Sequence, residues 1–481
     1  MKPFSRSPKA LSGFLVFLTF VLVWCLHLSG VSHAAPYITL SKKSGPPTSQ
    51  ILVSGSGFEA NVGVDIYFDT KDEGVVMTNS KGEFSNAKAY APRSARPGEH
   101  WVTALERNNH EHAQKPFLVR TDWSQFRFEA DGRRLNPYEN VLNAKNVGDL
   151  ELKWSYATSG VVWSSPAVVD GVVYVGSNDG HLYALKACSG AKLWSFTAGN
   201  SVQTSPAVVD GVVYAGSWDN NVYALNARTG ALLWKFATGD HVLSSPTVVN
   251  GVVYIGSWDG NVYALNAKTG VKLWSYQTGC AWWGCGVSSS PAVADGVVYV
   301  GSWNANVYAL NARTGDVLWT YPTGYIIIAS PVVAKGGVYI GSEDDSLYAL
   351  NARTGDLLWS YDFGDPVFSS TAVANGVVYV GIGDSPNGGV YGLNAKTGHL
   401  LWSYPDEWSV ASSPAVANGV VYVGLEGPEG NGILGAFDPR TGALLWSYGS
   451  SVSSSPTVVN GEVYVGSDGG NVFAFDLKSE Q

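Results

Sequence analysis

The stretch Ser164-Ser-Pro-Ala-Val-Val-Asp-Gly-Val-Val-Tyr-Val-Gly-Ser177 recurs, with small changes, eight times along the chain. Each copy is followed by a stretch of the type Val-Tyr-Ala-Leu-Asn-Ala-x-Thr-Gly, and all but the last copy then continue into x-Leu-Leu-Trp. Four short β-branched runs separated by turn residues are what a propeller blade requires, because a single four-stranded sheet buries both faces only against neighbours. The sequence therefore predicts an all-β, eight-bladed β-propeller. The copies are 40 to 45 residues apart, measured between Tyr174, Tyr214, Tyr254, Tyr299, Tyr339, Tyr379, Tyr422 and Tyr464.

Turn residues indicate how the four runs of a blade connect. An Asp-Gly or Asn-Gly pair, such as Asp170-Gly171, joins the first two runs in all blades but the fifth, and these pairs tolerate the positive φ angles of tight hairpins. The fifth blade has Lys335-Gly336-Gly337 instead. A Thr-Gly or Ser-Gly turn joins the third run to the fourth, and a tryptophan follows four residues later.

The two ends of the repeat region predict how the ring closes. After Val472-Phe473-Ala474-Phe475 the chain has no fourth run, whereas Leu152-Lys153-Trp154-Ser155-Tyr156 stands alone ahead of the first full copy. We expect this N-terminal run to complete the last blade, which would remove two unpaired sheet edges. The propeller would then span residues 151–478. We interpret the tryptophans of the fourth runs as docking between blades, at Trp154, Trp194, Trp234, Trp274, Trp319, Trp359, Trp402 and Trp446.

The motif Ala224-x-Asn226-x-x-Thr229-Gly230-x-x-x-Trp234 resembles the tryptophan-docking motif of the pyrroloquinoline quinone (PQQ) repeat propellers. The resemblance covers residues 151–477. That family includes the eight-bladed quinoprotein alcohol dehydrogenases and the non-enzymatic propeller lipoprotein of the outer-membrane β-barrel assembly machinery. It implies the fold and leaves the activity open. For an enzyme, it would imply PQQ in the central funnel, a calcium ion beside it and an Asp base.

Residues 1–34 have the three parts of a cleavable secretory signal peptide: basic residues, an apolar stretch from Phe14 to Leu28, and a small-residue site at Ser32-His33-Ala34. A membrane anchor is the alternative, but the apolar stretch is shorter than the ~20 residues that span a bilayer. We expect a secreted or extracytoplasmic monomer with no transmembrane segment in the mature chain.

Charge argues against nucleic acid as a partner. The chain has 30 Lys plus Arg against 39 Asp plus Glu, a formal net charge of −9. Removal of the signal takes away Lys2, Arg6 and Lys9 and no acid, which leaves 30 − 3 = 27 bases and a net charge of 27 − 39 = −12. A chain this acidic does not attract phosphate backbones.

Residues 36–121 differ in character from the repeats. Runs such as Ile51-Leu52-Val53 and Val64-Asp65-Ile66-Tyr67-Phe68, divided by Gly, Pro, Asn and Ser, predict a small β-sandwich. The segment 46–58 is similar to the opening of immunoglobulin-like IPT/TIG domains. Residues 122–150 resemble the lead-in that precedes the first Trp strand in PQQ-repeat proteins, and we treat them as a linker.

Connection lengths locate the surface where function is expected. The first-to-second and third-to-fourth intervals are constant, whereas the second-to-third and fourth-to-first intervals vary and would emerge together on the other side of the ring. Two readings of that side remain open: an aromatic, acid-rimmed pocket for a planar ligand, sugar or cation, or loop residues packed on adjacent blades, which we favour for Trp218, Trp258 and Trp303. The acidic candidates there are Asp179, Asp219, Asp259, Glu343, Asp344, Asp384, Glu426 and Asp468. The candidate binding face comprises Trp163, Trp218, Trp258, Trp303, Trp282 and Trp283.

The cysteines suggest one disulfide. Cys280 and Cys285 lie in a short insertion and would meet an oxidising compartment after export, so we expect them to be bonded. Zinc binding is the alternative, but two cysteines without a nearby histidine make a poor site. Cys188 stands where other Thr-Gly turns have Arg or Lys, and we expect it to be a free surface thiol.

Three functions remain open: a non-catalytic binding or scaffold propeller, a PQQ-dependent dehydrogenase, and a carbohydrate-binding propeller. The chain lacks the adjacent Cys-Cys pair and the Cys-x-x-Cys-His haem motif that the dehydrogenase resemblance would imply, and its blades lack long insertions. We therefore favour the non-catalytic function, name no catalytic residue, and favour no cofactor or metal. The partner would be a protein or a small planar or sugar ligand bound on the side of variable connections.

Overall fold

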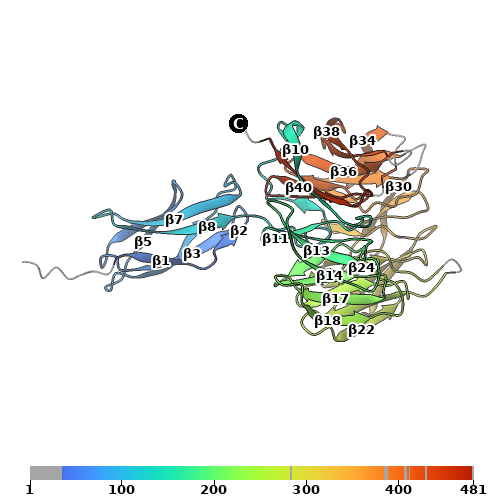
Figure 1. Cartoon of the computed structure of the whole chain (residues 1–481), viewed down its shortest axis with the longest axis horizontal. Helices are drawn as coiled ribbons and strands as arrows, with labels where there is room; N and C mark the ends of the chain where they lie inside the picture. The colour runs from blue at the N-terminus through green and yellow to red at the C-terminus, as the bar shows by residue number, and fades with distance from the viewer. Residues whose placement is uncertain are drawn as a thin grey trace, which may run out of the picture. The chain divides into compact units, whose positions relative to one another are not determined.

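The computed structural model describes residues 35–478 apart from 282–283, 384–387, 406–408, 411 and 428–430. The expected signal peptide, residues 1–34, lies outside the described residues. Figure 1 shows the course of the chain, which divides into two compact units. Of the described residues, the first unit contains residues 35–44, Thr48–Pro92 and Glu99–Leu118, and the second contains residues 45–47, 93–98 and those from 119 to 478. No helix of the described residues is long and apolar enough to cross a membrane.

The first unit contains two sheets, in the strand orders β1-β3-β6 and β2-β8-β7-β4-β5. Strands β1 and β3, β3 and β6, β4 and β5, and β4 and β7 pair antiparallel. Alternation of buried and exposed residues along β3 and β4 places Ile51, Val53, Val64, Ile66 and Phe68 in its core. The assignment to the immunoglobulin-like class stays a prediction. Its strands are β1 (Tyr37–Leu40), β2 (Ser44–Gly45), β3 (Gln50–Ser56), β4 (Gly63–Phe68), β5 (Lys71–Met77), β6 (Phe84–Tyr90), β7 (Gly98–Glu106) and β8 (His112–Val119).

The second unit is the propeller, and its eight sheets confirm the predicted number of blades. Blade one consists of β11 (Ala167–Val169), β12 (Val172–Gly176), β13 (His181–Lys186) and β14 (Lys192–Thr197), and blade two of β15 (Ala207–Val209), β16 (Val212–Gly216), β17 (Asn221–Asn226) and β18 (Leu232–Ala237). Blade three consists of β19 (Thr247–Val249), β20 (Val252–Gly256), β21 (Asn261–Asn266) and β22 (Lys272–Gln277). Blade four consists of β23 (Ala292–Ala294), β24 (Val297–Gly301), β25 (Asn306–Asn311) and β26 (Val317–Pro322).

Blade five consists of β27 (Val332–Ala334), β28 (Gly337–Gly341), β29 (Ser346–Asn351) and β30 (Leu357–Asp362). Blade six consists of β31 (Ala372–Ala374), β32 (Val377–Ile382), β33 (Gly389–Asn394) and β34 (Leu400–Pro405). Blade seven consists of β35 (Ala415–Ala417), β36 (Val420–Glu426), β37 (Gly432–Phe437) and β38 (Leu444–Gly449). Blade eight is β39 (Thr457–Val459), β40 (Glu462–Gly466) and β41 (Asn471–Leu477), completed by β10 (Leu150–Ala157). The remaining elements are β9 (Leu135–Asn136), which pairs with β35, and a 3₁₀ turn at Val147–Asp149.

The hairpin turns have the geometry that their sequences predict. Asp170 and Gly171 have φ angles of 54° and 73°, which a two-residue hairpin loop of type I′ requires. Lys335 of the exceptional fifth blade has a φ of 48°, so the same turn is made there without an Asp or Asn.

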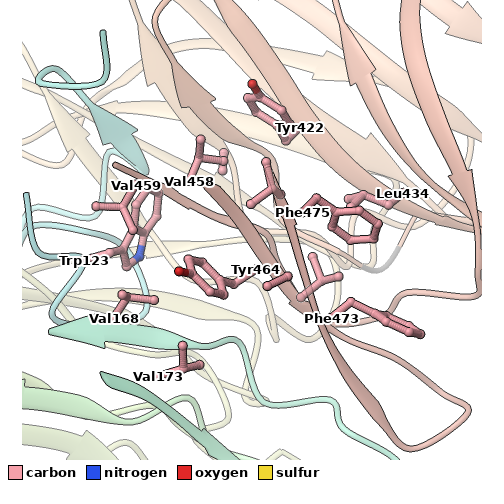
Figure 2. Packing of buried hydrophobic residues seen from close by; sticks show 14 of the residues in the cluster. Trp123, Val168, Val173, Tyr422, Leu434, Val458, Val459, Tyr464, Phe473 and Phe475 are labelled. Atoms are coloured by element: carbon pink, nitrogen blue, oxygen red, sulfur yellow. The ribbon is translucent and has the colours of Figure 1, made fainter. Parts of the chain in front are cut away.

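Closure of the ring follows the predicted one-plus-three arrangement. Strand β10 pairs antiparallel with β41, with Trp154 opposite Ala474 and Tyr156 opposite Val472. Side chains of blades seven, eight and one share one buried cluster around this junction, and Figure 2 shows Tyr464 and Phe475 in it. The first and last repeats are therefore joined both by hydrogen bonds and by a continuous apolar core.

Candidate functional site

The two sides of the ring differ in which connections they carry. Because the strands within each blade are antiparallel, the first-to-second and third-to-fourth turns lie on one side, which we call the turn face. The second-to-third and fourth-to-first connections lie on the other side, which we call the variable face. Of the expected binding residues, Trp163, Trp218, Trp258 and Trp303 are described, and all four lie in connections of the variable face.

The central channel is occupied by the chain's own residues 123–136, which we call the plug. The plug makes a hydrogen bond of 2.6–3.1 Å to the second residue of every innermost strand, so the inner edge of each blade is capped. The sequence predicted only a linker over residues 122–150 and did not indicate that part of it binds the innermost strands. The pairs are Trp123–Val168, Ser124–Val208, Gln125–Val248, Ala130–Val293, Asp131–Val333, Arg133–Val373, Arg134–Val416 and Asn136–Val458.

Two buried arginines hold the plug. Arg134 is completely buried and donates to the carbonyl oxygens of Pro414 at 2.6 Å, Phe126 at 2.5 Å and Pro456 at 2.8 Å. Arg127 donates to the carbonyls of Ser290, Pro291 and Pro331 in blades four and five. Burial lowers the pKa of each arginine to about 9, so both guanidinium groups stay charged at neutral pH. Carbonyl oxygens, not carboxylates, receive their hydrogen bonds.

A closed ring of serines surrounds the channel. The serine before each innermost strand donates its backbone N–H to the hydroxyl oxygen of its counterpart in the next blade, at 2.9–3.1 Å. Ser455 of blade eight donates to Ser165 of blade one, which completes the circle. The recurring serine is visible in the sequence, but its role depends on how neighbouring blades are placed. The ring comprises Ser165, Ser205, Ser245, Ser290, Ser330, Ser370, Ser413 and Ser455.

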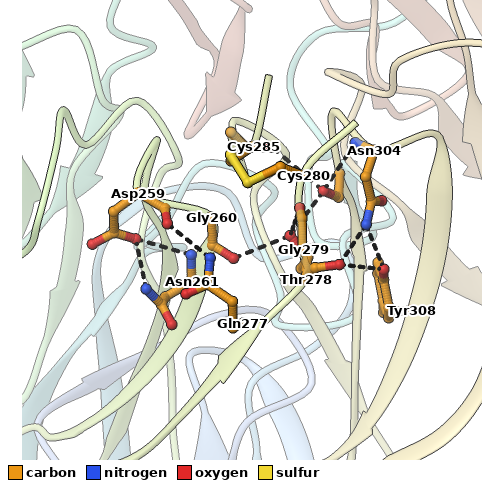
Figure 3. The surroundings of a disulfide bond; sticks show 12 residues. Asp259, Gly260, Asn261, Gln277, Thr278, Gly279, Cys280, Cys285, Asn304 and Tyr308 are labelled. Atoms are coloured by element: carbon orange, nitrogen blue, oxygen red, sulfur yellow. Dashed lines mark hydrogen bonds between the residues drawn. A yellow bond between two sulfur atoms is a disulfide. The ribbon is translucent and has the colours of Figure 1, made fainter. Parts of the chain in front are cut away.

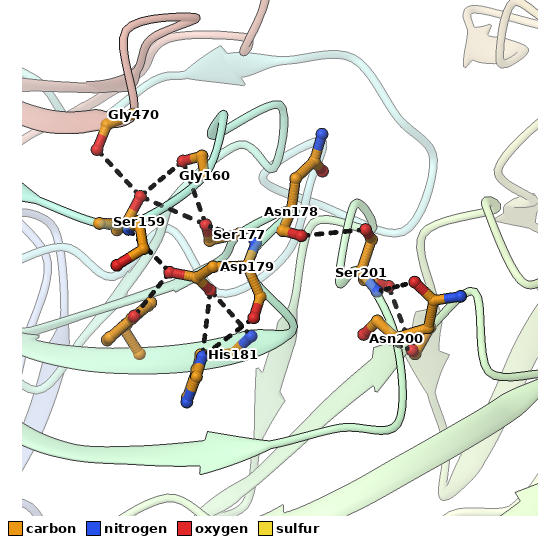
Figure 4. Close-up of polar contacts among 12 residues, drawn as sticks. Ser159, Gly160, Ser177, Asn178, Asp179, His181, Asn200, Ser201 and Gly470 are labelled. Carbon is orange, nitrogen blue, oxygen red and sulfur yellow. Dashed lines mark hydrogen bonds and ion pairs between the residues drawn. The ribbon is translucent and has the colours of Figure 1, made fainter.

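Most of the acidic candidates on the variable face are engaged in fixing loops. Asp179 accepts hydrogen bonds from the backbone N–H groups of Ser159 and His181 (Figure 4). It also accepts one from the Tyr183 hydroxyl at 2.8 Å. Burial opposes ionisation, but these hydrogen bonds outweigh it and lower the pKa of Asp179. The same arrangement with a tyrosine four residues later recurs at Asp219, Asp259 and Asp344. Asp384 lies outside the described residues.

Glu343 differs from these aspartates. It occupies the position of Trp218 in its own blade, and burial raises its pKa to about 7. A carboxyl group with this pKa is protonated in roughly half of the molecules near neutral pH. The charge of this part of the variable face therefore changes within the physiological range.

Three of the candidate tryptophans form a continuous aromatic row across blades two to four. Trp218 stacks on His241, with ring centroids 5.0 Å apart and an interplanar angle of 14°. Trp258 lies 5.9 Å from Trp218 and 4.9 Å from Trp303. The indole of Trp258 also donates to the Ser288 hydroxyl at 2.8 Å. All three indoles remain half-buried, so the row packs on the blades and still presents aromatic surface. His241 was not singled out from the sequence.

Trp163 lies elsewhere on the variable face. It is 44% exposed and donates to Asp468 at 3.0 Å. With Val161, Glu426, Ser451 and Ser453 these two residues line a hollow of about 550 Å³ where blades seven, eight and one meet. Burial, with Asp468 nearby, raises the pKa of Glu426. The last two candidates, Trp282 and Trp283, lie outside the described residues.

Cys280 and Cys285 form a disulfide, with Cα atoms 4.1 Å apart, and Cys188 is a free, exposed thiol. Figure 3 shows the loop anchored beside it, where Thr278 donates to Gly260 and the Tyr308 hydroxyl donates to the Thr278 carbonyl at 2.8 Å. The disulfide therefore closes the insertion next to the aromatic row.

We expect the double variant Cys280→Ser/Cys285→Ser to lose about 2 kcal/mol of stability in this loop, because the disulfide restricts a short loop in the unfolded state. Faster proteolysis within residues 278–288, with the far blades unchanged, would be the result. Cys188→Ser is the matched control and should have no effect. Mass spectrometry of non-reduced peptides checks the pairing, and a crosslink to Cys188 would refute it.

The fourth-strand tryptophans connect neighbouring blades. Trp194 donates its indole N–H to the carbonyl of Ala227 in the next blade at 2.9 Å and packs on Gly230, where an added Cβ would come within 2.7 Å of the ring. Gly230 is therefore required at this turn for two reasons: its φ angle is positive, and the ring of Trp194 leaves no room for a side chain. Trp446 of blade seven bonds to Leu150 of the closing strand. The same indole bond is made by Trp154, Trp234, Trp274, Trp319, Trp359 and Trp402.

The charges on the variable face do not match the quinone that the resemblance implies. PQQ carries several carboxylates, and proteins bind such groups with Arg or Lys. The connections of the variable face contain no lysine or arginine, and the donors of Arg127 and Arg134 are directed at carbonyls. Among the residues that the structure describes, no group of three or more His, Cys, Asp and Glu could hold a metal. The described residues therefore do not provide the cations that would bind the carboxylates of PQQ or a cluster of ligands for calcium.

Comparison with known proteins identifies the family. A family model described as outer membrane protein assembly factor BamB matches residues 178–325 and 323–481, which is more than half of the chain. A model described as the β-propeller domain of glucose/ethanol/alcohol dehydrogenase matches residues 123–203. The chain belongs to the PQQ-repeat β-propeller family. No curated protein sequence matches it significantly.

Solved structures share the fold at low sequence identity. BamB from Moraxella catarrhalis is 19% identical, with a TM-score of 0.58 over 68% of this chain and 99% of that one. A europium-containing methanol dehydrogenase is 17% identical, with a TM-score of 0.64 over 74% and 98%. Quinohemoprotein alcohol dehydrogenase from Comamonas testosteroni is 18% identical, with a TM-score of 0.64 over 75% and 81%. Both a BamB and dehydrogenases thus resemble this fold, and the fold alone does not choose between them.

Proposed function

We propose that this protein is an exported, non-catalytic binding propeller that holds a protein or a small planar or sugar ligand on its variable face. The observation that carries the proposal is the composition of that face, which combines the row of Trp218, Trp258 and Trp303 with carboxylates and has no lysine or arginine. Aromatic rings of this kind stack on planar rings and on the apolar faces of sugars. Export rests on the sequence of residues 1–34.

The alternative, a PQQ-dependent dehydrogenase, has the family likeness in its favour. The plug arginines would not supply cations for a quinone, because Arg127 and Arg134 donate to backbone carbonyls. A cofactor bound instead on the variable face would find no lysine or arginine in the connections there to pair with its carboxylates.

Titration of the purified full chain with PQQ and Ca²⁺ tests the choice. We expect no saturable change in the quinone absorbance and no alcohol-dependent dye reduction. Stoichiometric quinone binding together with dye reduction would overturn the non-catalytic function. As a positive readout, binding of soluble oligosaccharides and of planar aromatic ligands would be followed by tryptophan fluorescence. Trp258→Ala should weaken any such binding, whereas Lys235→Gln on an outer strand should leave it unchanged.

A further inference from the structure

A second surface of the ring has an unusual composition. At the start of the outermost strand, next to the third-to-fourth turn, two successive aliphatic side chains are exposed in blades two, four, five and six, where an edge strand usually carries charge. Leu232 and Leu233 of blade two are 47% and 51% exposed, and Leu357 and Leu358 of blade five are 46% and 52% exposed. We call these turns and the aliphatic residues beside them the outer rim. Its exposed aliphatic residues are Leu193, Leu232, Leu233, Val271, Leu273, Val317, Leu318, Leu357, Leu358, Leu400, Leu401 and Leu444.

A β-bulge causes this exposure. In blade two, Ala224 pairs with Trp234 but the adjacent Leu225 pairs with Leu232, so Leu233 is the extra residue of the outer strand. A bulge of this kind breaks the alternation of a strand, and successive side chains no longer point to opposite faces. Both leucines consequently face solvent while Trp234 still docks. The same register shift recurs in blades one to seven.

Cations accompany the leucines. The side-chain carbonyl of Asn226 accepts hydrogen bonds from the backbone of Arg228 and Thr229, which fixes the turn and leaves the Arg228 side chain outside it. Within the described part of the chain, Arg228, Arg313 and Arg353 form no ion pair. The bases of these connections outnumber the acids Asp316, Asp356 and Asp438. They are Lys186, Lys192, Arg228, Lys268, Lys272, Arg313, Arg353, Lys396 and Arg440.

We infer that the outer rim is a docking surface for an anionic lipid bilayer. Third-to-fourth turns of a closed ring all emerge on the turn face, so an arc of several blades can meet one flat surface at once. Cations next to exposed aliphatic residues are the combination that binds anionic headgroups and enters the interfacial layer. The variable face, which has no lysine or arginine, would then point away from the lipid.

The uniformity of the rim favours a bilayer over a protein partner. A protein recognises one site through features that distinguish it from its neighbours, whereas the rim repeats one chemistry from blade to blade. A lipid surface is itself uniform and matches that repetition. Two copies of the ring joined rim to rim would bring like charges together, which disfavours self-association through this surface.

Cosedimentation of the full chain with vesicles tests the inference. The wild type should bind phosphatidylglycerol/phosphatidylcholine vesicles and not phosphatidylcholine vesicles, and binding should weaken as salt is raised. The variant Arg228→Gln/Arg313→Gln/Arg353→Gln/Lys396→Gln should bind about tenfold more weakly or worse, because each surface cation contributes to headgroup attraction. The variant Leu232→Ser/Leu233→Ser/Leu357→Ser/Leu358→Ser should also bind more weakly.

A matched control separates the rim from net charge. Lys42→Gln/Lys81→Gln/Lys88→Gln/Lys115→Gln removes the same number of cations from exposed positions of the first unit and should retain binding. All substituted residues are exposed, and circular dichroism should show the same fold for each variant. The inference is overturned if the wild type does not bind the anionic vesicles, or if the rim variants bind as well as the wild type. Rim-dependent dimerisation without vesicle binding would overturn it as well.

Discussion

Removing the closing strand is expected to abolish the cooperative fold of the ring. Replacement of residues 150–157 by a Gly-Ser segment of equal length removes the side chains that hold β10 in place beside β41, where it pairs from Leu150–Leu477 to Ala157–Asn471. The indole bond from Trp154 to Ala187 is lost, and a segment of low strand propensity is expected to detach and take the carbonyl of residue 150 away from Trp446. Strand β41 would then present an unpaired edge, and the buried cluster around Tyr464 and Phe475 would be opened to water.

Thermal unfolding and size-exclusion chromatography measure the effect. We expect the replacement to lower the melting temperature far more than deletion of residues 36–118, and to cause aggregation or exchange of strands between chains. A monomeric variant that melts within a few degrees of the wild type would contradict one-plus-three closure.

Arg134→Ala is expected to cause the largest loss among single substitutions. The buried carbonyls of Pro414 and Pro456 and the partly buried carbonyl of Phe126 would lose a charged donor. An unsatisfied buried polar group costs about 1–3 kcal/mol, so a fall of about 3–5 kcal/mol in the free energy of unfolding follows even if water replaces part of the contacts. The guanidinium also lies over the rings of Trp123 and Phe126, and this contact would be lost.

The neighbouring residue provides the control. Arg133 is half-buried and pairs with Glu129 at 2.6 Å and with Asp131 at 2.7 Å. Exposed ion pairs contribute about 0–1 kcal/mol, so Arg133→Ala should have a small effect. Arg134→Lys should restore only part of the stability, because one ammonium group does not reproduce the fork of a guanidinium. Urea titration followed by tryptophan fluorescence compares the three variants, and equal midpoints for Arg133→Ala and Arg134→Ala would refute the role of Arg134.

The repeat made the fold predictable, because the same local signals occur in every blade. The positive φ angles at Asp170-Gly171 and the lone run around Trp154 both have a local cause that the sequence displays. Equivalent positions in successive blades also become neighbours in space, which is why Trp218, Trp258 and Trp303 could be placed on one face. The contact of His241 with Trp218 and Trp258 depends on a fourth-to-first connection and was not foreseen.

The plug could not be predicted in the same way. Residues 123–136 have no periodicity, and they bond mainly through backbone groups to partners that lie up to 322 residues away. Arg134 gives no local signal, since a buried arginine and a surface arginine look alike in a sequence. The roles of the acidic candidates also depend on contacts that the sequence does not display. Asp179 and Asp219 each fix a loop through backbone N–H groups and a tyrosine hydroxyl.

Hydrogen exchange resolved to single amides tests the central claim, that the chain's own residues 123–136 lie in the channel and cap the inner edge of the blades. The amides of Val208, Val293 and Val333 lie on the free edge of innermost strands and donate only to the plug. The account predicts that they exchange as slowly as the amides between β12 and β13, and that Arg134→Ala accelerates their exchange. Rapid exchange of these amides in the wild type, at the rate of a solvated strand edge, would contradict it.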